Sequence, residues 1–401
     1  MKEVVIGFLG CGNVGGGVWS LLTGFSREIA HRDSLSIRIK RVLVRDVNKT
    51  RACGVPHELL TTNADDVVSD PEISIVVEFM GGEQPALNWH RLQAAAQRNH
   101  VGLYYEASVC GAIPIINTLM QPLQANRIDS LMGIINGTTN YILSRMYENG
   151  EDYEAVLHDA QQLGLAEPNP SADVEGLDAA YKLSIMASLA FHARVPFSKV
   201  YREGITKITA VDIAYAREMG YVLKLLAIAK RSGNTIEVRV HPTLIANDHP
   251  LSQVNGSFNA VYLHGHACKE MMLQGRGAGD LPTASAVVGD ILHAATVDVH
   301  VHPTFVNSAN ADASLVFTND WKTRYFLRLS IQDEPGSLAK IATWLSSEQV
   351  SIATMMQKAE LAGSRVPLII ITHEANEQAI RAALAKFDPE VCTVENMIRV
   401  E

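Results

Sequence analysis

The sequence predicts an α/β protein with three parts: a doubly wound, Rossmann-like parallel sheet, an inserted α+β domain, and a C-terminal ferredoxin-like βαββαβ domain. A β-rich run over residues 4–9 is followed immediately by the glycine-rich turn GCGNVG and a helical segment, the order that opens a dinucleotide-binding unit. Strand-like and helix-like segments then alternate through residue 105, as they do in parallel sheets. Residues 321–401 follow the order strand, helix, strand, strand, helix, strand.

Length and composition set the class of protein. The chain has 401 residues, 47% of them hydrophobic and 19% charged, and at about 100–200 residues per domain this predicts roughly two to four domains. The net charge of −9 argues against a nucleic-acid-binding protein, which needs a basic face. No apolar run reaches the ~18 residues that cross a bilayer, and the cysteines form no CxxC pair. We therefore expect a cytoplasmic protein with neither a nucleic-acid nor a membrane partner.

The glycine-rich turn after the first strand predicts a nicotinamide cofactor. In such turns the first glycine permits a tight bend, the second lets a pyrophosphate approach the backbone, and the third lets the helix pack closely on the sheet. The helix N-terminus then offers free N–H groups to the phosphates. A glycine turn that binds no ligand is the alternative. The predicted cofactor contacts here are Gly10, Gly12, Asn13, Val14 and Gly15.

The next elements extend the predicted sheet. A strand over residues 37–44 ends in Arg45-Asp46; an acidic residue there favours NAD and an arginine favours NADP, so the choice stays open. A continuous apolar strand over residues 73–79, of the kind found where both sheet faces are covered, places Met80 and Gly81 at the ligand-binding edge. A helix over residues 85–98 and a strand over residues 101–105 complete this half.

Two polar segments in the middle of the chain are candidates for a substrate site. The loop INGTTN follows a predicted strand and could place Gly137 and Thr138 against a small ligand, although such residues also simply cap helices. Further on, Asp178 and Lys182 are i,i+4 neighbours on a helix that is apolar nearly all round after Lys182. A solvated surface pair is the alternative to a partly buried lysine that delivers a proton.

The order of the motifs carries a family resemblance. GFLGCGNVGGGV, VVEFMGG, EASVCGAIPI, NGTTNYIL, EPNPSADVEGLDAAYKLSIMA and GRGAGDLPTASAVVGDI resemble homoserine dehydrogenase over about residues 1–320. The resemblance implies NAD(P)H-dependent reduction of L-aspartate 4-semialdehyde to L-homoserine, on the route to threonine, methionine and isoleucine. It further implies that Lys182 donates the proton with Asp178 as its partner, that Glu167 holds the substrate amino group, and that Asp173 supports the acidic wall around it.

The same resemblance implies two further groups of ligands. EASVCGAIPI resembles a monovalent cation site, and one carboxylate with carbonyl oxygens suits a hard cation such as sodium better than zinc; a plain turn is the alternative. GRGAGD resembles the segment that returns to the cofactor domain near the nicotinamide. The implied cation ligands are Glu106, Val109, Gly111 and Ile113, and the implied nicotinamide neighbours are Gly277 and Gly279.

The tail resembles an ACT domain. After a connector over residues 301–321, strands are expected at residues 325–332, 351–360, 365–374 and 394–401, with helices at 337–349 and 375–387. The turn DEPG resembles the amino-acid-binding loop of ACT domains, and the family resemblance implies threonine as the effector, with Asp333 and Gly336 at its site. A turn that caps a helix and binds nothing is the alternative.

One family feature is missing. Relatives carry a Thr-Ala-Asn-Lys segment whose lysine acts beside the one equivalent to Lys182, but this chain runs RNHVGLYYEAS from helix to the next motif. A strand–helix unit is therefore expected to be absent between His100 and Val101. This keeps one alternative to the enzyme open, a catalytically impaired regulatory protein that binds cofactor and amino acid. A separate possibility is another amino-acid dehydrogenase, such as one acting on aspartate.

These assignments predict the domain limits. The NAD(P)-binding domain takes residues 1–115 and 277–320, the substrate and dimerisation domain residues 116–276, and the regulatory domain residues 321–401. A homodimer or homotetramer is expected, with apolar residues 185–191 serving either as an interface or as core.

Overall fold

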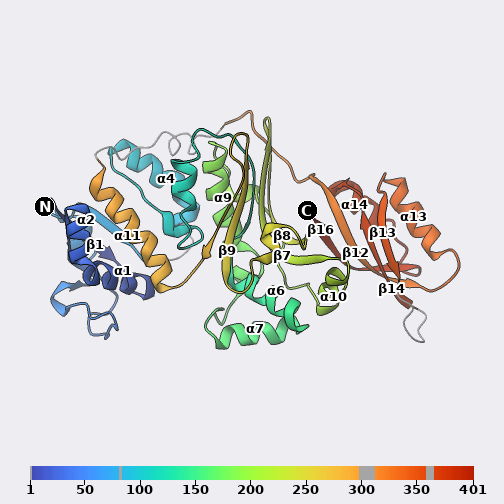
Figure 1. Ribbon diagram of the computed structural model, residues 1–401, viewed down its shortest axis with the longest axis horizontal. Coiled ribbons are helices and arrows are strands. Elements are labelled where there is room, and N and C mark those ends of the chain that lie inside the picture. The colour runs from blue at the N-terminus through green and yellow to red at the C-terminus, as the bar shows by residue number, and fades with distance from the viewer. Residues whose placement is uncertain (1, 81–83, 298–311, 358–364) are drawn as a thin grey trace. The chain divides into compact units, whose positions relative to one another are not determined.

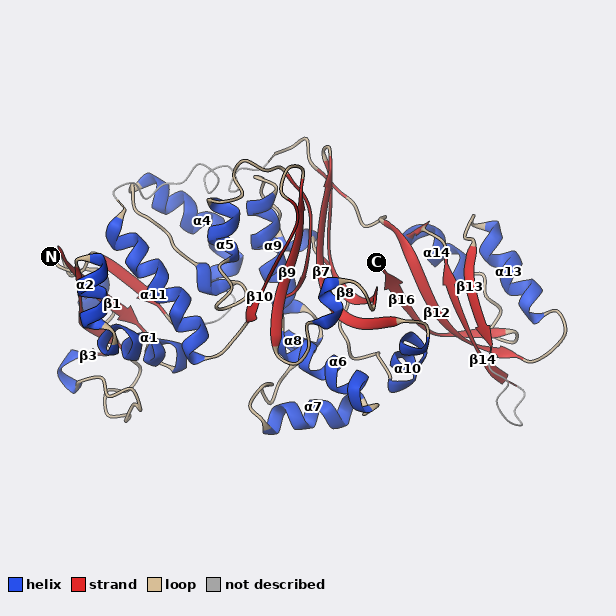
Figure 2. Cartoon of the chain, in the orientation of Figure 1, coloured by secondary structure: helices blue, strands red, loops and turns tan. Residues whose placement is uncertain are grey.

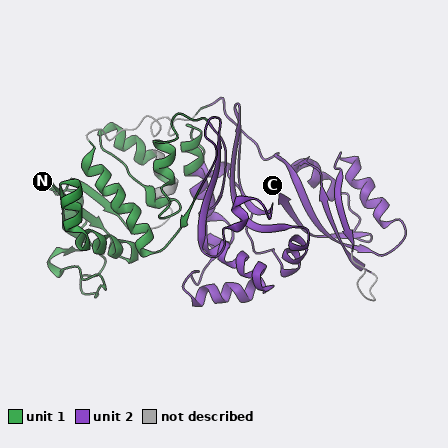
Figure 3. Ribbon diagram, viewed as in Figure 1, with its two compact units in different colours: residues 1–127, 185–195, 273–312 green, residues 128–184, 196–272, 313–401 purple. Residues whose placement is uncertain are grey.

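The computed structural model describes residues 2–80, 84–297, 312–357 and 365–401. The chain divides into two compact units (Figure 3). The first comprises Met1–Arg127, Ile185–Val195 and Leu273–Asp312, and the second comprises Ile128–Ser184, Pro196–Met272 and Ala313–Glu401. The predicted Gly81 and most of the predicted connector over residues 301–321 lie outside the described residues. In the described part of the chain, no helix is long and apolar enough to cross a membrane.

The first unit is built on a four-stranded parallel sheet in the order β3-β2-β1-β4. The central strand, β1, is nearly continuously apolar, and its middle residues are buried because both faces of the sheet are covered there. This confirms the predicted Rossmann-like sheet. Its strands are β1 (Lys2–Leu9), β2 (Leu35–Leu43), β3 (Leu60–Thr61) and β4 (Ile75–Glu78).

Helices from both ends of the first unit's sequence share one core. Side chains of β1 and of the first helix pack with Ala284, Ile291 and Ala295 of α11. A Cβ atom at Gly17 would lie 2.9 Å from the Asp280 carbonyl oxygen, so a glycine is needed for α1 to pack on α11. The helices are α1 (Asn13–Gly24), α2 (Ser26–Asp33), α3 (Asp65–Val68), α4 (Gln84–Arg98), α5 (Ile115–Met120) and α11 (Asp280–Thr296), with short 3-10 turns at His57–Leu59 and Glu106–Ser108 (Figures 1 and 2).

The prediction that both faces of the strand over residues 73–79 are covered is wrong. Among the described residues, strand β4 lies at the edge of the sheet and pairs with β1 alone. Its residues alternate between half-buried and exposed, and Val76 is 44% exposed. In a longer sheet a further strand would continue beyond β4, so its exposed pattern agrees with the absence of a strand–helix unit.

The predicted strand over residues 101–105 is also wrong. These residues have no regular structure and lead directly into the 3-10 turn Glu106–Ser108. The chain leaves α4 through His100, whose positive φ of 53° redirects the backbone, and Val101 is exposed. Seven residues, 99–105, separate α4 from this turn, and in the described part of the chain the β-rich sequence VGLYY pairs with no strand.

The second unit contains a mixed sheet of 12 strands. Its main path is β10-β9-β5-β7-β8-β16-β12-β14-β13, and β6, β11 and β15 attach at the sides. The long β7–β8 hairpin is buried over most of its length, so it forms the centre of the core. The strands from the middle of the chain are β5 (Ile128–Ile134), β6 (Tyr201–Arg202), β7 (Tyr221–Ser232), β8 (Thr235–Ala246), β9 (Phe258–Gly265), β10 (Lys269–Arg276) and β11 (Val316–Phe317).

Helix α9 (Leu177–Ala190) begins in the second unit, and its residues from Ile185 onward, which include the apolar stretch at 185–191, belong to the first unit. Ile185, Met186, Leu189 and Phe191 are at most 7% exposed within the chain itself, so this stretch is core rather than a free surface. The other helices of this part are α6 (Gly137–Asn149), α7 (Tyr153–Gln162), α8 (Ser171–Val174) and α10 (Ala210–Glu218), with 3-10 turns at Phe197–Lys199 and Pro250–Gln253.

The tail has the predicted βαββαβ order, and its four long strands lie in the antiparallel order β16-β12-β14-β13. The last strand also pairs with β8 through Arg399 and Val400, so the tail sheet continues the middle sheet. The end of the predicted connector contains strand β11, which pairs with β8. The tail elements are β12 (Lys322–Gln332), α13 (Ser337–Ser347), β13 (Ile352–Gln357), β14 (Arg365–Thr372), β15 (Ala375–Asn376), α14 (Glu377–Leu384) and β16 (Cys392–Val400).

Candidate active site

Lys182 and Asp178 form the centre of a polar cluster in the second unit. The Lys182 Nζ donates to Asp178 Oδ2 at 2.7 Å and to the Ile135 carbonyl oxygen at 3.2 Å. Their side chains are 20% and 32% exposed, respectively, so the pair is half-buried and not a solvated surface pair. Helix α9 supplies both residues one turn apart, as their i,i+4 spacing predicts.

Asn136 joins Asp178 to Asp173. Its Nδ2 donates to Asp173 Oδ1 at 2.6 Å and to Asp178 Oδ2 at 3.0 Å, while its Oδ1 accepts from the Thr139 backbone N–H and so caps α6. Burial raises the pKa of Asp173 above its ordinary value, and the Asn136 hydrogen bond opposes this shift. Sequence reasoning missed Asn136; its position just before a helix marked it as a cap and gave no sign of the two carboxylates.

The two predicted residues next to Asn136 are held by backbone groups. Thr138 Oγ1 donates to the Leu165 carbonyl oxygen at 2.7 Å, so it ties the start of α6 to the segment before Glu167. A Cβ atom at Gly137 would lie 3.0 Å from the Ser257 carbonyl oxygen, which explains the glycine by packing. Glu167 is exposed, and among the described residues its carboxylate does not enter the hydrogen bonds of the cluster.

The predicted cofactor turn has the geometry that a pyrophosphate needs. Gly10 has φ of 102°, a left-handed conformation that favours glycine, and Gly12 has open space where a Cβ atom would lie. A Cβ atom at Gly15 would lie 3.3 Å from the Phe79 ring, so its absence allows close packing. Asn13 and Val14 begin α1, whose N-terminal N–H groups are available to an anion.

The other residues predicted near the cofactor lie in the same unit. Arg45 and Asp46 are both exposed after β2, and Met80 is 57% exposed just beyond β4. Gly279, with φ of 118°, precedes α11. Gly277 packs backbone to backbone against Gly111, because a Cβ atom at Gly111 would lie 2.6 Å from the Gly277 carbonyl oxygen.

Glu106 and its neighbours form a buried acidic site in the first unit. The Glu106 carboxylate accepts from the backbone N–H groups of Ile116 and Asn117 at 2.8 and 2.7 Å, at the start of α5. Burial raises the pKa of Glu106 to about 7 and that of Asp290, which accepts from the Glu106 backbone N–H, to about 6. The Ile113 carbonyl oxygen already accepts from Ile115. Two of the four implied cation ligands, Glu106 and Ile113, therefore have hydrogen bonds of their own; Val109 is buried and Gly111 has φ of 52°.

The predicted effector turn lies at the start of α13. Gly336 has φ of 98° and immediately precedes the helix, and Ser337 begins it as predicted. Asp333 Oδ1 accepts from Gln357 Nε2 of β13 at 3.5 Å. The turn thus lies beside the neighbouring strand and presents a helix N-terminus.

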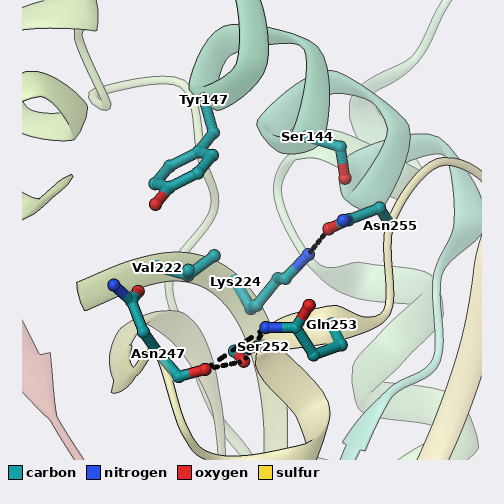
Figure 4. A pocket seen from close by; sticks show the side chains of 8 residues that line it. All are labelled: Ser144, Tyr147, Val222, Lys224, Asn247, Ser252, Gln253 and Asn255. Carbon is teal, nitrogen blue, oxygen red and sulfur yellow. Dashed lines mark hydrogen bonds between the residues drawn. The ribbon is translucent and has the colours of Figure 1, made fainter. Parts of the chain in front are cut away.

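A buried lysine, Lys224, lines a cavity of about 250 Å³ in the second unit (Figure 4). Lys224 of β7 is 1% exposed and donates to Asn140 Oδ1, the Val254 carbonyl oxygen and Asn255 Oδ1 at 3.2, 2.6 and 3.0 Å. Burial lowers the pKa of Lys224 to about 8. Ser144 and Tyr147 also line the cavity, at about two and three turns along α6 from the Asn136 cap.

Comparison with known proteins agrees with these features. A family model described as homoserine dehydrogenase matches residues 114–292, and one described as the NAD-binding domain of homoserine dehydrogenase matches residues 10–102. The two ranges leave residues 103–113 unmatched, next to the junction at His100 and Val101.

Relatives match over nearly their whole length. Homoserine dehydrogenase of Corynebacterium glutamicum is 40% identical over 100% of this chain and 96% of its own, and that of Bacillus subtilis is 38% identical over 94% and 93%. The alignment with the Corynebacterium protein runs over 430 residues against 401 here, so that relative has residues without a counterpart in this chain.

A solved homoserine dehydrogenase from Thiobacillus denitrificans is 41% identical and superposes with a TM-score of 0.93, covering 100% of this chain and 99% of that one. The Staphylococcus aureus homoserine dehydrogenase, solved at pH 8.5, is 29% identical with a TM-score of 0.77 over 100% and 99%. With two family models, near-complete coverage of both chains and the same fold, the chain belongs to the homoserine dehydrogenases, NAD(P)-dependent oxidoreductases that act on a CH–OH group.

Proposed function

We propose that the cluster around Lys182 reduces L-aspartate 4-semialdehyde to L-homoserine. The observation that carries this proposal is the pair Lys182–Asp178 with its hydrogen bond at 2.7 Å. A bound nicotinamide would supply the hydride for the aldehyde carbon. Lys182 Nζ then stabilises and protonates the oxygen that becomes the alcohol, since a half-buried ammonium can act as a general acid. Asp178 and the Ile135 carbonyl oxygen hold the amine in position for this transfer.

The acidic wall gives the substrate its orientation. Asp173 and Asp178 lie within hydrogen-bond reach of the same Asn136 amide, and carboxylates hold an ammonium through charge-assisted hydrogen bonds. We assign the substrate amino group to Asp173 and Asp178, with Glu167 of the neighbouring loop as a third contact. Gly137 and Thr138 would line the other side of the substrate. An aldehyde without an ammonium group would lose these contacts, which accounts for an amino-acid substrate.

The residues of the first unit fit a dinucleotide. The open space at Gly12 and the free N-terminus of α1 support a pyrophosphate there, with Gly10 and Gly15 setting the turn. We assign Arg45 to the adenosine ribose or its phosphate, and Met80, Gly277 and Gly279 to the nicotinamide half. Arg45 and Asp46 are both exposed, so either NADH or NADPH is compatible with this end.

A sodium ion is proposed at Glu106, with carbonyl oxygens of Val109, Gly111 and Ile113. A cation there would offset the cost of burying the Glu106 carboxylate, whose pKa is raised to about 7. Titration of the protein with NaCl at constant ionic strength, with choline chloride as the control, measures whether sodium binds and stabilises the Glu106 carboxylate. Sodium should lower the pKa of Glu106, and thermal stability at pH 8 should rise with sodium alone.

The tail is proposed to be an ACT domain that binds threonine at the turn containing Asp333 and Gly336. Its βαββαβ order and the helix N-terminus after Gly336 support an amino-acid carboxylate at this turn. Pairing of two tails would complete the site, so the proposed assembly is a homodimer or homotetramer. Threonine inhibition of the purified enzyme, lost in Asp333→Ala, is the corresponding measurement.

The decisive experiment is turnover. The purified protein is mixed with aspartate 4-semialdehyde and NADPH or NADH, and the loss of reduced nicotinamide absorbance is followed. We expect turnover that Lys182→Ala abolishes, even though the Thr-Ala-Asn-Lys segment is missing. Binding of cofactor and threonine without turnover above the Lys182→Ala variant would instead identify a regulatory protein, and turnover that requires ammonia would identify an amino-acid dehydrogenase of another kind.

A further inference from the structure

The backbone of residues 203–205 packs against the segment that carries Asp173 and Asp178. The Ile205 backbone N–H donates to the Val174 carbonyl oxygen at 2.8 Å. Gly204 packs directly against the backbone of Val174 and Glu175, and a Cβ atom there would clash with both. Asp173 precedes Val174 in the chain, so the position of this acidic residue depends on the backbone of residues 203–205.

Glu203 fixes that backbone on its other side. Its backbone N–H donates to the Val240 carbonyl oxygen of β8 at 2.8 Å. Its carboxylate Oε2 accepts from the Tyr201 hydroxyl at 3.1 Å and from Arg399 Nη1 at 2.5 Å. The Glu203 side chain is 32% exposed, whereas that of Arg399 is fully buried.

Arg399 belongs to the last strand of the tail and is held rigidly there. Its Nη2 and Nε donate to the two carboxylate oxygens of Glu377 at 2.6 and 3.2 Å, a bidentate arrangement that fixes the guanidinium plane. The guanidinium also lies 5.3 Å from the centre of the Tyr201 ring. A planar, forked side chain is needed to reach Glu203 and Glu377 at once, and a lysine could not do so.

We propose that Arg399 and Glu203 are positioning residues for the substrate-binding carboxylate Asp173, so that the tail sets the affinity of the active site for substrate. This inference rests on the proposed role of Asp173. The route runs from Glu377 and Arg399 of the tail through Glu203 to Gly204 and Ile205, and from there by a backbone hydrogen bond to Val174. Neither residue touches the reacting atoms, so they act on substrate binding rather than on the chemical step.

The experiment compares Glu203→Ala with a matched control, Glu374→Ala. Removing the Glu203 carboxylate leaves Arg399 paired with Glu377, so no buried charge is orphaned. Glu374 is also in an ion pair of the tail, with Lys322, but both side chains are more than half exposed at 65% and 63%, and such pairs contribute little. For Glu203→Ala we expect KM for aspartate 4-semialdehyde to rise about 5-fold or more, the lower end of coupling between sites, with kcat and KM for the cofactor nearly unchanged.

Three further variants make the test specific. Glu203→Gln keeps an oxygen that can accept from Arg399 and Tyr201, so it should restore part of the lost affinity. Arg399→Lys should raise KM in the same direction, and the double variant Glu203→Ala/Arg399→Lys should be no worse than the more damaging single variant, because both changes break one route. Additive effects in this cycle would contradict the route.

The outcomes separate this inference from the proposed function. If Asp173→Asn raises KM for the substrate while folded Glu203→Ala and Arg399→Lys leave it unchanged, the positioning role is wrong and the active site stands. If Asp173→Asn itself leaves KM for the substrate unchanged, the proposed role of Asp173 in binding the substrate is wrong, and the inference loses its basis. A change in KM for the cofactor equal to that for the substrate would point to general loosening and would also overturn the inference.

Discussion

Two lysines of the second unit, Lys182 and Lys224, differ in burial and in their hydrogen-bond partners. Lys182 and Lys224 each donate to a backbone carbonyl oxygen. Lys182 also donates to a carboxylate, Asp178, at 2.7 Å, whereas Lys224 donates to the neutral amide oxygens of Asn140 and Asn255. Lys182 is 20% exposed by side chain and Lys224 is 1% exposed.

The difference in exposure and in partners suits Lys182 to a chemical role and Lys224 to a structural one. Lys182 has a carboxylate partner and is partly open to solvent, as its proposed role at a substrate requires. Lys224 instead donates three hydrogen bonds that hold α6 to the loop after β8. Burial lowers its pKa to about 8, and the charge of Glu148 opposes this shift. Helix α6 therefore has the proposed catalytic cluster at its N-terminal cap and the buried Lys224 contacts farther along.

The largest expected effect comes from removing the reactive amine. Lys182→Met should lower kcat by about 10²–10⁴-fold, the usual contribution of a positioned general acid. The far-ultraviolet circular dichroism spectrum should be unchanged. Initial rates with aspartate 4-semialdehyde measure the loss, and Lys224→Met serves as the matched control. Comparable losses of kcat in both variants would break the distinction between the two lysines.

The next largest effect concerns substrate binding beside Lys182. Asp173→Asn removes a charge but keeps the shape of the side chain, so KM for the substrate should rise about 10- to 100-fold, as expected for loss of a charge-assisted hydrogen bond of about 1.5–3 kcal/mol. Steady-state kinetics at saturating cofactor measure it. An exposed acid elsewhere on the same unit, as in Glu374→Gln, should leave KM unchanged, and a fall in kcat alone would assign Asp173 to the chemical step.

A smaller effect is expected at the structural lysine. Lys224→Met leaves the acceptors Asn140 Oδ1, Val254 O and Asn255 Oδ1 without this donor, so the free energy of unfolding should fall by about 1–3 kcal/mol. Denaturant unfolding followed by fluorescence measures the change. Enzymatic activity of the folded variant should stay within about twofold of the wild type, because the cavity at Lys224 is separate from the cluster at Lys182.

The last prediction concerns the pH dependence of stability. The folded-state pKa of Lys224 is about 8 and its ordinary value is 10.5, so between these values the unfolded chain binds more protons. Stability due to Lys224 should therefore rise as the pH increases from about 8 to 10.5, and level off below pH 8. Subtracting the unfolding curves of Lys224→Met removes the contribution of other groups. A difference that falls with increasing pH would show that the amine is stabilised in its charged form.

Local features of the site could be predicted from the sequence, and contacts between distant residues could not. The GCGNVG turn and the Lys182–Asp178 pair depend on a few consecutive residues, and both occur as expected. Asn136 lies 37 residues from Asp173 and 42 from Asp178, and Arg399 lies 196 residues from Glu203. No local pattern encodes such pairs.

The strand predicted over residues 101–105 failed for a related reason. The sequence VGLYY favours an extended strand, but a strand forms only where another strand can pair with it. The short path from α4 to the turn at Glu106 leaves no such partner, so the preference is overridden. The βαββαβ tail succeeded because its alternating pattern repeats over many residues, although its pairing with β8 depends on the long-range arrangement of the sheet.

The position of β16 also has a consequence for how the protein is made. Arg239 Nη2 of β8 and Glu401 Oε1 pair at 2.5 Å although they are 162 residues apart, and β16 lies between β8 and β12 in the sheet. On the ribosome, β8 emerges long before β16, so its edge at Thr243 and Leu244, where the two strands pair, stays open until synthesis reaches Arg399 and Val400. Long-range pairing of this kind slows folding and exposes edges to aggregation, so this chain should depend on chaperones while it is translated.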